Sequence, residues 1–202
     1  MHLRDTYNLI AEEWHKDHQT DDWWLEGTDT FISLLQQGDT VLDVGCGGGT
    51  KSKYLLEHGL RVTGIDFSEK LLEIARKENK DGEFILMDMY DVKDLHTTFN
   101  GIFAQASLLH IPKKDFTTIV SLLVSQLQQD GLLYIAVKIS SGKNTQEEIK
   151  EENKYGHTYT RFFSYYSMDE LIDAYKKSGL EVVYTSSNQT GNKEWLQIIG
   201  RK

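Results

Sequence analysis

The sequence predicts an α/β fold in which parallel strands alternate with helices. Residues 41–50, VLDVGCGGGT, combine a short apolar run, four glycines within five residues and the start of a helical segment. Two later apolar runs each lead into an aspartate, Asp66 and Asp88. The last two expected strands, 180–186 and 194–200, are joined by a short polar turn, which favours an antiparallel pair. Together these observations predict a seven-stranded, mostly parallel sheet with an antiparallel last strand and helices on both faces.

The remaining elements follow from the spacing of apolar residues. The expected strands are short apolar runs at residues 41–44, 60–65, 83–87, 99–106, 131–139, 180–186 and 194–200. The expected helices carry apolar residues three and four positions apart, at residues 2–16, 28–37, 50–58, after the N-cap Ser68, 115–128 and 167–178. Residues 140–166 are polar and rich in tyrosine, and we expect a short helical piece near 146–153.

Composition narrows the classes of function. The 202 residues include 22 lysines and arginines and 31 aspartates and glutamates, a net charge of −9, which argues against a broad nucleic-acid or anionic-membrane surface. Cys46 is the single cysteine, so we expect no internal disulfide, and this suits a cytoplasmic location. Residues 1–19 lack the apolar segment of a signal peptide, and no run reaches the roughly 20 apolar residues of a membrane span.

The glycine turn indicates a ligand without a phosphate. Gly45, Gly47 and Gly49 fall in the pattern GxGxG, and Thr50 occupies the position where the dinucleotide fingerprint GxGxxG has its third glycine. Asp43 precedes the turn by two residues. A pyrophosphate binds at a helix N-terminus without a carboxylate beside it, whereas an amino group suits Asp43. The turn therefore favours a ligand with an amino group.

The other two acids complete a description of that ligand. Asp66 lies about 20 residues beyond the first glycine, where a carboxylate accepts hydrogen bonds from ribose hydroxyls. Asp88, at the end of the next strand, suits the exocyclic amine of adenine. Each acid taken alone is equally well explained as a helix cap or a turn former. Amine, ribose and adenine together describe S-adenosylmethionine.

At this point the sequence resembles the class I S-adenosylmethionine-dependent methyltransferases, in their small-molecule, methyltransferase domain 11/25-like form. The resemblance covers residues 40–138, where VLDVGCGGG is similar to the family's first motif, VTGIDFS to its ribose-binding motif and FILMDM to its adenine-binding motif. FNGIFAQASLLHIPKKD and LLVSQLQQDGLLYIAVK resemble the segments around its fourth and fifth strands, although Gln129-Asp130-Gly131 replaces the usual Pro-Gly-Gly. The family implies a Rossmann-like fold and S-adenosylmethionine as cofactor.

The resemblance also implies a division of the chain and of the cofactor site. A single domain, 1–202, would comprise a lid helix and connector (1–27), a cofactor-binding core (28–139), an insertion over the acceptor site (140–166) and closing elements (167–202). The implied cofactor-binding residues are Tyr7, Trp14, Asp43, Gly45, Cys46, Gly47, Asp66, Phe67, Ser68, Asp88, Met89 and Ala106. Among them, an aromatic residue of the lid helix would cover the cofactor, and Ala106 would lie near the methionine amino group.

Histidine and aromatic residues outside the glycine turn are the candidates for the reaction itself. His110 follows the fourth strand and is the candidate catalytic base, because histidine titrates near neutrality; the alternative is a structural histidine bonded to a carbonyl. The candidate acceptor-binding residues are Trp23, Trp24, His157, Tyr159, Arg161 and Tyr165. Alternatively, both tryptophans pack on the domain's own surface and Arg161 pairs with Glu151 or Glu152. No spacing of metal-ligating residues suggests a metal site.

The favoured function is transfer of a methyl group from S-adenosylmethionine to a small molecule by in-line displacement, leaving S-adenosylhomocysteine. SLLHIP stands where nucleic-acid and glutamine methyltransferases carry an Asn-Pro-Pro-Tyr type signature, and the acidic charge likewise favours a small acceptor over DNA. We expect a cytoplasmic monomer or homodimer with no nucleic-acid partner. Two alternatives stay open: a nicotinamide-dependent oxidoreductase on a Rossmann fold, and a non-catalytic sensor that binds S-adenosylmethionine.

Overall fold

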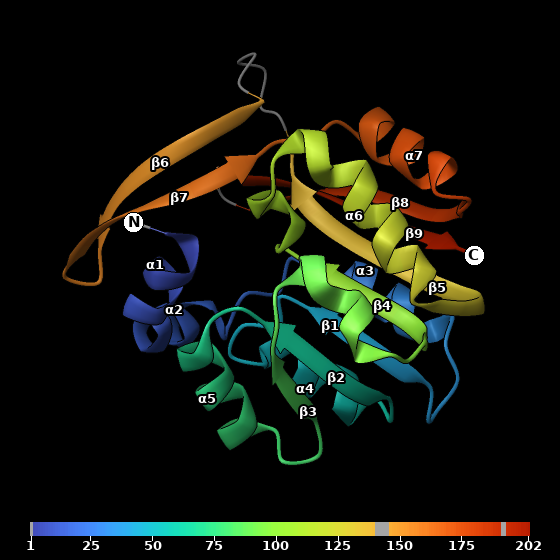
Figure 1. The fold of residues 1–202 in the computed structure, drawn as a ribbon, viewed down its shortest axis with the longest axis horizontal. Helices are drawn as coiled ribbons and strands as arrows, with labels where there is room; N and C mark the ends of the chain where they lie inside the picture. The colour runs from blue at the N-terminus through green and yellow to red at the C-terminus, as the bar shows by residue number, and fades with distance from the viewer. Residues whose placement is uncertain (1, 140–145, 191–192) are drawn as a thin grey trace.

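A twisted, mostly parallel sheet forms the centre of the molecule (Figure 1). The computed structural model describes residues 2–139, 146–190 and 193–202, and within them seven strands pair in the order β3-β2-β1-β4-β5-β9-β8. The strands of this sheet are β1 (Thr40–Val44), β2 (Arg61–Asp66), β3 (Glu83–Leu86), β4 (Phe99–Gln105), β5 (Leu127–Lys138), β8 (Glu181–Thr190) and β9 (Lys193–Arg201). β1 to β5 pair in parallel, whereas β9 is antiparallel to both β5 and β8. The predicted fold class is confirmed.

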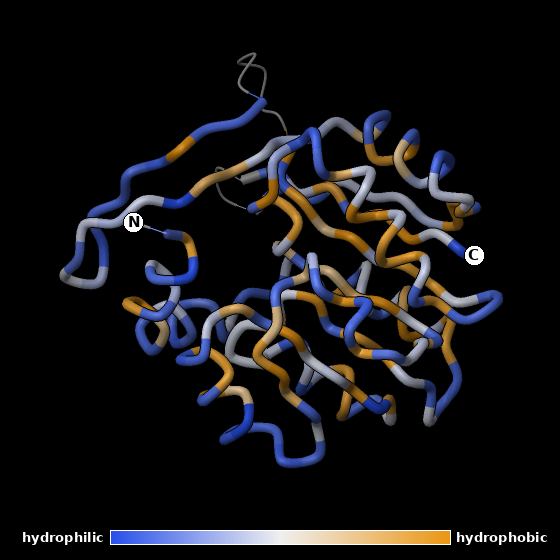
Figure 2. The backbone as a smooth tube through the Cα atoms, viewed as in Figure 1, coloured by the Kyte–Doolittle hydropathy of each residue, from blue (hydrophilic) through white to orange (hydrophobic). Residues whose placement is uncertain are grey.

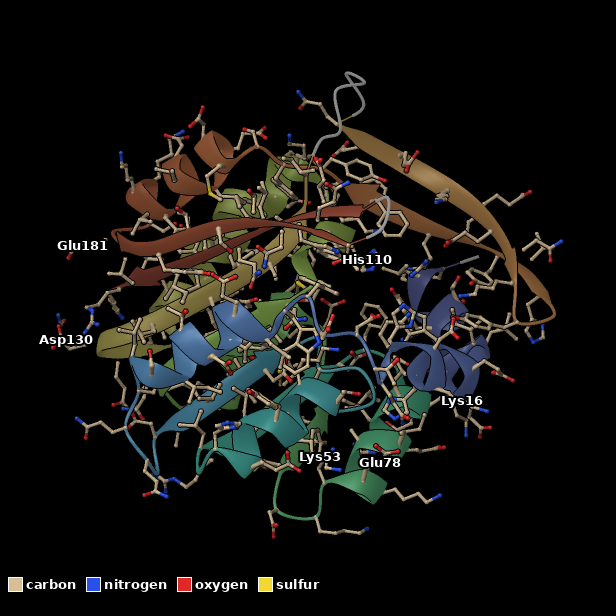
Figure 3. All side chains as sticks on the ribbon, turned by 180° about the vertical axis from the view of Figure 1, so that it is seen from behind. Lys16, Lys53, Glu78, His110, Asp130 and Glu181 are labelled. Atoms are coloured by element: carbon tan, nitrogen blue, oxygen red, sulfur yellow. The ribbon has the colours of Figure 1, made fainter. Side chains whose placement is uncertain are left out.

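Helices cover both faces of the sheet. The α-helices are α1 (Leu3–Leu9), α2 (Ala11–His18), α3 (Leu25–Ser33), α4 (Thr50–Glu57), α5 (Glu69–Glu78), α6 (Lys113–Ser125) and α7 (Met168–Lys177), and two 3-10 helices are η1 (Met89–Leu95) and η2 (Leu108–His110). Figure 1 shows α6 and α7 in front of the sheet, and Figure 3, from behind, shows α3 and α4 on the opposite face.

Successive side chains along each strand point to opposite faces of the sheet, and each face packs into its own hydrophobic core. Leu42 and Ile102 belong to the core beneath α6 and α7, while their neighbours Val41 and Phe103 belong to the core beneath α3 and α4. All four side chains are completely buried. Full burial of one such side chain stabilises the folded state by about 1.5–3 kcal/mol. Because both faces are covered, these strands read as nearly continuous apolar runs in the sequence.

The N-terminal segment differs from the continuous helix expected at residues 2–16. The chain forms two helices, α1 and α2, which meet at Ile10, where φ is −107° and ψ is 11°. The Ile10 side chain is completely buried, so tertiary packing holds the bend. α3 also begins three residues before the expected residue 28, and Gly27 within it leaves room for the Gln197 side chain.

The expected helical piece near residues 146–153 is wrong. These residues form β6 (Glu147–Lys154), which pairs with β7 (His157–Ser164) in an antiparallel hairpin. Glutamate and lysine favour helices, but the segment has no apolar stripe to bury, and Figure 2 shows β6 as mostly hydrophilic. Cross-strand pairing with β7 decides its conformation instead. Residues 140–145 of the expected insertion lie outside the described residues.

The hairpin and the first helices cover one edge of the sheet together. The hydroxyl of Thr6 in α1 donates to the carbonyl of Thr160 in β7 at 3.1 Å. Asp17 in α2 accepts hydrogen bonds from Lys154 and Tyr155, which lie at the far end of the hairpin. Figure 1 shows the hairpin extending from the sheet to these helices. Segments about 140 residues apart in the chain therefore enclose the carboxyl ends of the parallel strands.

Candidate active site

The glycine turn after β1 brings bare backbone against the end of β4. Gly45 has a φ of +73°, and a Cβ built on it would lie 2.5 Å from the Cβ of Ser107. A side chain at Gly48 would overlap the ring of His15 in α2. Only glycine fits at these two positions, so the turn is in direct contact both with the strand-end segment and with the N-terminal helices.

Asp66, the last residue of β2, links the glycine turn to α5. One of its carboxylate oxygens accepts the Gly47 N–H at 2.9 Å, and the other accepts the Ser68 N–H at 2.8 Å. The residue is 8% exposed, and burial raises its pKa to about 6, although the backbone hydrogen bonds lower it. Ser68 caps α5 by accepting the Leu71 N–H, and its predicted N-cap role is confirmed.

Asp43 is the more deeply buried of the acids near the turn. Its carboxylate accepts the hydroxyl of Ser52 at 2.6 Å, and only 2% of the residue is exposed. Burial raises the pKa of Asp43 to about 7, while the Ser52 hydrogen bond and the positive charge of Lys51 lower it. Burial in turn lowers the pKa of Lys51. A half-buried cation at the start of α4 therefore acts electrostatically on a buried acid at the end of β1.

Asp88 occupies a different environment from the other two acids. Its carboxylate accepts the Tyr90 N–H at 3.1 Å, and so caps η1. It lines a second cavity of about 880 Å³, which shares Phe67, Met89 and His110 with the main cavity. The three acids thus lie at the same sheet edge, as predicted, but they do not line one chamber.

The main cavity encloses about 540 Å³ at the carboxyl ends of the parallel strands. Of the predicted site residues, it is lined by Tyr7, Trp14, Trp23, Asp43, Gly45, Cys46, Gly47, Asp66, Phe67, Met89, Ala106, His110 and Arg161. Ser68, Asp88, Trp24, His157, Tyr159 and Tyr165 are not among its lining residues. Most of the residues predicted to bind the cofactor therefore line this cavity, whereas of those predicted to bind the acceptor only Trp23 and Arg161 do.

His110 lies near the centre of the molecule, as Figure 3 shows, and it is held between two hydrogen-bond partners. Its Nδ1 lies 2.7 Å from the carbonyl oxygen of Phe162, so Nδ1–H donates to that carbonyl. Its Nε2 lies 2.8 Å from the hydroxyl of Tyr7 and accepts from it. Burial lowers the pKa of His110 to about 3, and the charges of Arg161 and Lys138 add to this effect. His110 is neutral at physiological pH, and the carbonyl-bonded alternative fits this geometry.

Arg161 in β7 extends the same hydrogen-bonded chain. It forms an ion pair with Glu152, with Nε at 2.5 Å and Nη2 at 2.9 Å from the two carboxylate oxygens. Its Nη1 also lies 3.3 Å from the Tyr7 hydroxyl. The pairing with Glu152 was one of the sequence alternatives, and it is present. Arg161 nevertheless lines the main cavity, so the pair does not withdraw it from a ligand.

The two tryptophans of the connector have separate surroundings. Trp23 stacks on Trp195 with ring centroids 3.9 Å apart and an angle of 11° between planes, and both line the main cavity. Trp24 is buried against Tyr54 at 5.2 Å, and the Lys51 ammonium lies 4.9 Å from its ring centroid. The surface-packing alternative thus fits Trp24, whereas Trp23 forms part of the cavity wall.

The remaining acceptor candidates lie on the hairpin and beside it. His157 is exposed at the start of β7, and Tyr159 is buried. The Tyr165 hydroxyl donates to Glu148. None of these three lines the cavity; His157 and Tyr159 share a face of β7 with Arg161 but lie farther along the strand, toward the hairpin turn. In the described ranges, no group of three or more metal-ligating side chains is present.

Several residues that line the cavity were not predicted from the sequence. His15 packs on the glycine turn and bonds Glu78 in α5, while Lys51, Gln105, Lys138 and Trp195 line the cavity. A signal existed for Lys51, which directly follows the stretch 41–50, and for Gln105 and Lys138, which lie one residue before the ends of expected strands. Trp195 had none, because only the antiparallel register of β9 places it opposite Lys138.

Comparison with known proteins agrees with this geometry. Residues 41–131 match the family model described as "Methyltransferase domain". A ubiquinone biosynthesis O-methyltransferase of Hydrogenovibrio crunogenus is 25% identical over 186 residues, which cover 83% of this chain and 76% of that protein. A protein of the same name from Coxiella burnetii is 55% identical over 85 residues, 39% of this chain and 36% of its own length. Like it, several curated relatives match over less than half of their length.

A solved structure extends the likeness to the whole fold. The 1,6-didemethyltoxoflavin N1-methyltransferase of Burkholderia thailandensis, crystallised with its substrate and S-adenosylhomocysteine, superposes with a TM-score of 0.77. The two chains are 19% identical, and the match covers 99% of this chain and 87% of the other. The strand order and the cavity at the carboxyl ends of the strands are typical of α/β proteins that bind nucleotide-like ligands. Residues 41–131 are thus similar to a methyltransferase domain, and the whole chain shares its fold with S-adenosylmethionine-dependent methyltransferases.

Proposed function

We propose that this enzyme transfers the methyl group of S-adenosylmethionine to a small-molecule acceptor held in the main cavity. The proposal rests on one observation: residues expected to bind the cofactor and residues expected to bind the acceptor line the same cavity. Asp66 and the glycine turn line one part of it, while Trp23 and Arg161 line another. Its volume of about 540 Å³ lies within the range of roughly 300–1,000 Å³ typical of small-molecule sites. The relatives named for ubiquinone biosynthesis and toxoflavin also support a small acceptor.

The residues present fit the parts of this cofactor. Asp66 supplies a carboxylate that accepts hydrogen bonds from ribose hydroxyls, and Phe67 beside it suits the face of adenine. Lys51 supplies a positive charge for a carboxylate at the methionine end. The hydroxyl of Ser107 is buried with no hydrogen-bond partner among the described residues, and Ser107 lines the cavity. A buried polar atom without a partner is costly, and a polar ligand group would satisfy it.

The second cavity supports a proposal for the adenine amine. Asp88 and Met89 both line it, and Met89 and Phe67 also line the main cavity, so the two spaces meet at these side chains. Asp88 accepts one backbone N–H and keeps further acceptor capacity. We propose that the carboxylate of Asp88 accepts a hydrogen bond from the exocyclic amine of adenine. The adenine would extend past Met89 to reach it.

When bound, S-adenosylmethionine supplies a methyl carbon activated by a positively charged sulfur. The chain's own residues orient the acceptor and exclude water, and such positioning supplies up to about 7–11 kcal/mol of a barrier. Tyr7 and Trp14 line the cavity from the N-terminal helices, which the hairpin holds in place. No protein base is required for this reaction.

His110 is better suited to positioning than to accepting a proton. Its Nε2 already accepts the Tyr7 hydroxyl, and its lowered pKa of about 3 makes it a weak base at neutral pH. We therefore assign His110 the role of fixing Tyr7, and through Tyr7 the guanidinium of Arg161, at the cavity wall.

The two alternatives make different predictions. A nicotinamide-dependent oxidoreductase needs a pyrophosphate beside the glycine turn, where the buried acid Asp43 opposes it. A non-catalytic sensor has the same cofactor site and differs only in lacking turnover.

Calorimetric titration of the full chain tests the proposal. We expect saturable binding of S-adenosylmethionine and S-adenosylhomocysteine and no binding of NAD. Asp66→Ala should weaken binding by about 1–3 kcal/mol, while Asp169→Ala, an exposed acid in α7, should leave it unchanged. Absence of heat with either adenosyl ligand would overturn the proposal. Binding without methyl transfer in a broad screen of small aromatic, amine and thiol acceptors would favour the sensor.

We also infer the setting in which the enzyme works. The net charge of −9 supports an enzyme without a nucleic-acid partner. Its single cysteine, Cys46, is buried and unpaired, which supports a reducing, cytoplasmic location. Within the described ranges, no helix has both the length and the apolar character to cross a bilayer. A monomer or homodimer stays our expectation.

A further inference from the structure

Gln105 and Trp195 line the main cavity from two different strands of the central sheet. Gln105 ends β4, two residues before Ser107, which lies against Gly45 of the glycine turn. Trp195 lies near the start of β9 and stacks on Trp23, with the two ring planes 11° apart. The stacked indoles form a flat apolar wall, which suits a planar ring. Gln105 therefore lies near the glycine turn, and Trp195 belongs to an aromatic wall of the same cavity.

The register of the sheet places these two side chains on one face and gives their separation. Gln105 pairs with Ala136 in β5. Trp195 pairs with Lys138, two residues farther along that strand. Residues that pair across strands share a face of the sheet, as do residues two apart in one strand. Two strand spacings of about 4.8 Å and two residues of about 3.3 Å each place the Cα atoms of Gln105 and Trp195 roughly 12 Å apart.

Each of these two side chains holds a buried polar atom without a partner. The indole N–H of Trp195 is a hydrogen-bond donor, and the side-chain oxygen of Gln105 is an acceptor. Neither atom has a hydrogen-bond partner among the described residues, and Trp195 is only 6% exposed. Each unsatisfied buried group costs about 1–3 kcal/mol. A ligand in this cavity that accepts from the indole and donates to Gln105 removes both costs.

We propose that the cavity binds a planar aromatic methyl acceptor with a hydrogen-bond donor at one edge and an acceptor atom at the opposite edge. The donor, a hydroxyl or N–H group, bonds the side-chain oxygen of Gln105, and a carbonyl oxygen or ring nitrogen accepts the indole N–H of Trp195. A ring with substituents at opposite edges spans the separation with a hydrogen bond of about 2.8–3.0 Å at each end. This rests on the proposed function, because it names the class of acceptor for that site. Gln105 and Trp195 are then residues that determine specificity.

Fragment binding in the presence of saturating S-adenosylhomocysteine tests the proposal. 4-Hydroxyacetophenone carries both groups, whereas 4-methoxyacetophenone lacks the donor and 4-ethylphenol lacks the carbonyl. Each is titrated into the full chain in neutral buffer and followed by ligand-observed NMR. We expect 4-hydroxyacetophenone to bind at least about tenfold more tightly than either analogue, because each analogue leaves one buried group unsatisfied. Binding as tight by either analogue, or no binding of 4-hydroxyacetophenone, would overturn the proposal.

Variants then connect each hydrogen bond to its residue. Gln105→Met removes the side-chain oxygen and should lower the affinity for 4-hydroxyacetophenone about tenfold, while the affinity for 4-methoxyacetophenone stays within about twofold. Trp195→Phe removes the indole N–H and should lower the affinity for 4-hydroxyacetophenone more than that for 4-ethylphenol. Gln129→Met makes the first change at an exposed position of β5 and should alter none of these affinities.

A conservative variant keeps the test decisive if Gln105→Met does not fold. Gln105→Glu retains an acceptor oxygen and should keep the preference for 4-hydroxyacetophenone over 4-methoxyacetophenone. Loss of that preference in Gln105→Glu, or an equal loss of affinity for both compounds in folded Gln105→Met, would refute the assignment of Gln105. Failure of the wild type to bind S-adenosylhomocysteine would instead refute the proposed function itself.

Discussion

Ionisation of Asp66 should control the affinity for the cofactor. In the ligand-free protein, burial raises the pKa of this carboxyl to about 6, against an ordinary value of 3.8. The difference corresponds to about 3 kcal/mol against the ionised form. Ribose hydroxyls donate hydrogen bonds to the ionised carboxylate and therefore favour it. Binding at a pH below about 6 should consequently release a proton from Asp66.

Titration calorimetry with S-adenosylhomocysteine in buffers of different protonation enthalpy measures both affinity and proton release. We expect the association constant to rise with pH by as much as about tenfold per pH unit up to about pH 6, and then to level off. Asp66→Asn should weaken binding by about 1–3 kcal/mol and remove the released proton. Asp43→Asn changes the other buried acid near the glycine turn, and should leave the Asp66 step in place.

Two results would refute this reasoning. The first is a wild-type affinity that does not change between about pH 4.5 and pH 7, since the ligand would then not distinguish the two forms of the carboxyl. The second is a proton release near pH 6 that persists in Asp66→Asn. Either result would separate Asp66 from the ribose.

The remaining predictions concern stability. Burial raises the pKa of Asp43 to about 7, so the folded protein loses stability as the pH rises through that value. In urea denaturation, Asp43→Asn should therefore raise the free energy of unfolding more at about pH 8 than at about pH 5, and an equal rise at both would contradict this. Tyr7→Phe leaves Nε2 of His110 without its donor and should lower the free energy of unfolding by about 1–3 kcal/mol, whereas no change would argue against the bond. Gly48→Ala should displace His15, lower the melting temperature and weaken S-adenosylhomocysteine binding; unchanged values would contradict the contact.

Local patterns determined the strands of the central sheet, most of its helices and many of the residues that line the main cavity. A buried strand, a glycine turn and an amphipathic helix each leave their mark within about ten residues of sequence, so residues 41–50 were interpretable alone. Asp43 and Asp66 were located because an aspartate near the end of a parallel strand falls at the carboxyl edge of the sheet.

Only the tertiary structure decided the part of the cavity proposed for the acceptor. Tyr7 and His110, whose side chains are bonded, lie 103 residues apart, and the hairpin partner Phe162 lies a further 52 residues along. No local pattern encodes such contacts, because they depend on how separate elements pack. The pairing of Lys138 with Trp195 likewise follows from the register of β9, and a shift of one residue would turn the indole to the opposite face of the sheet.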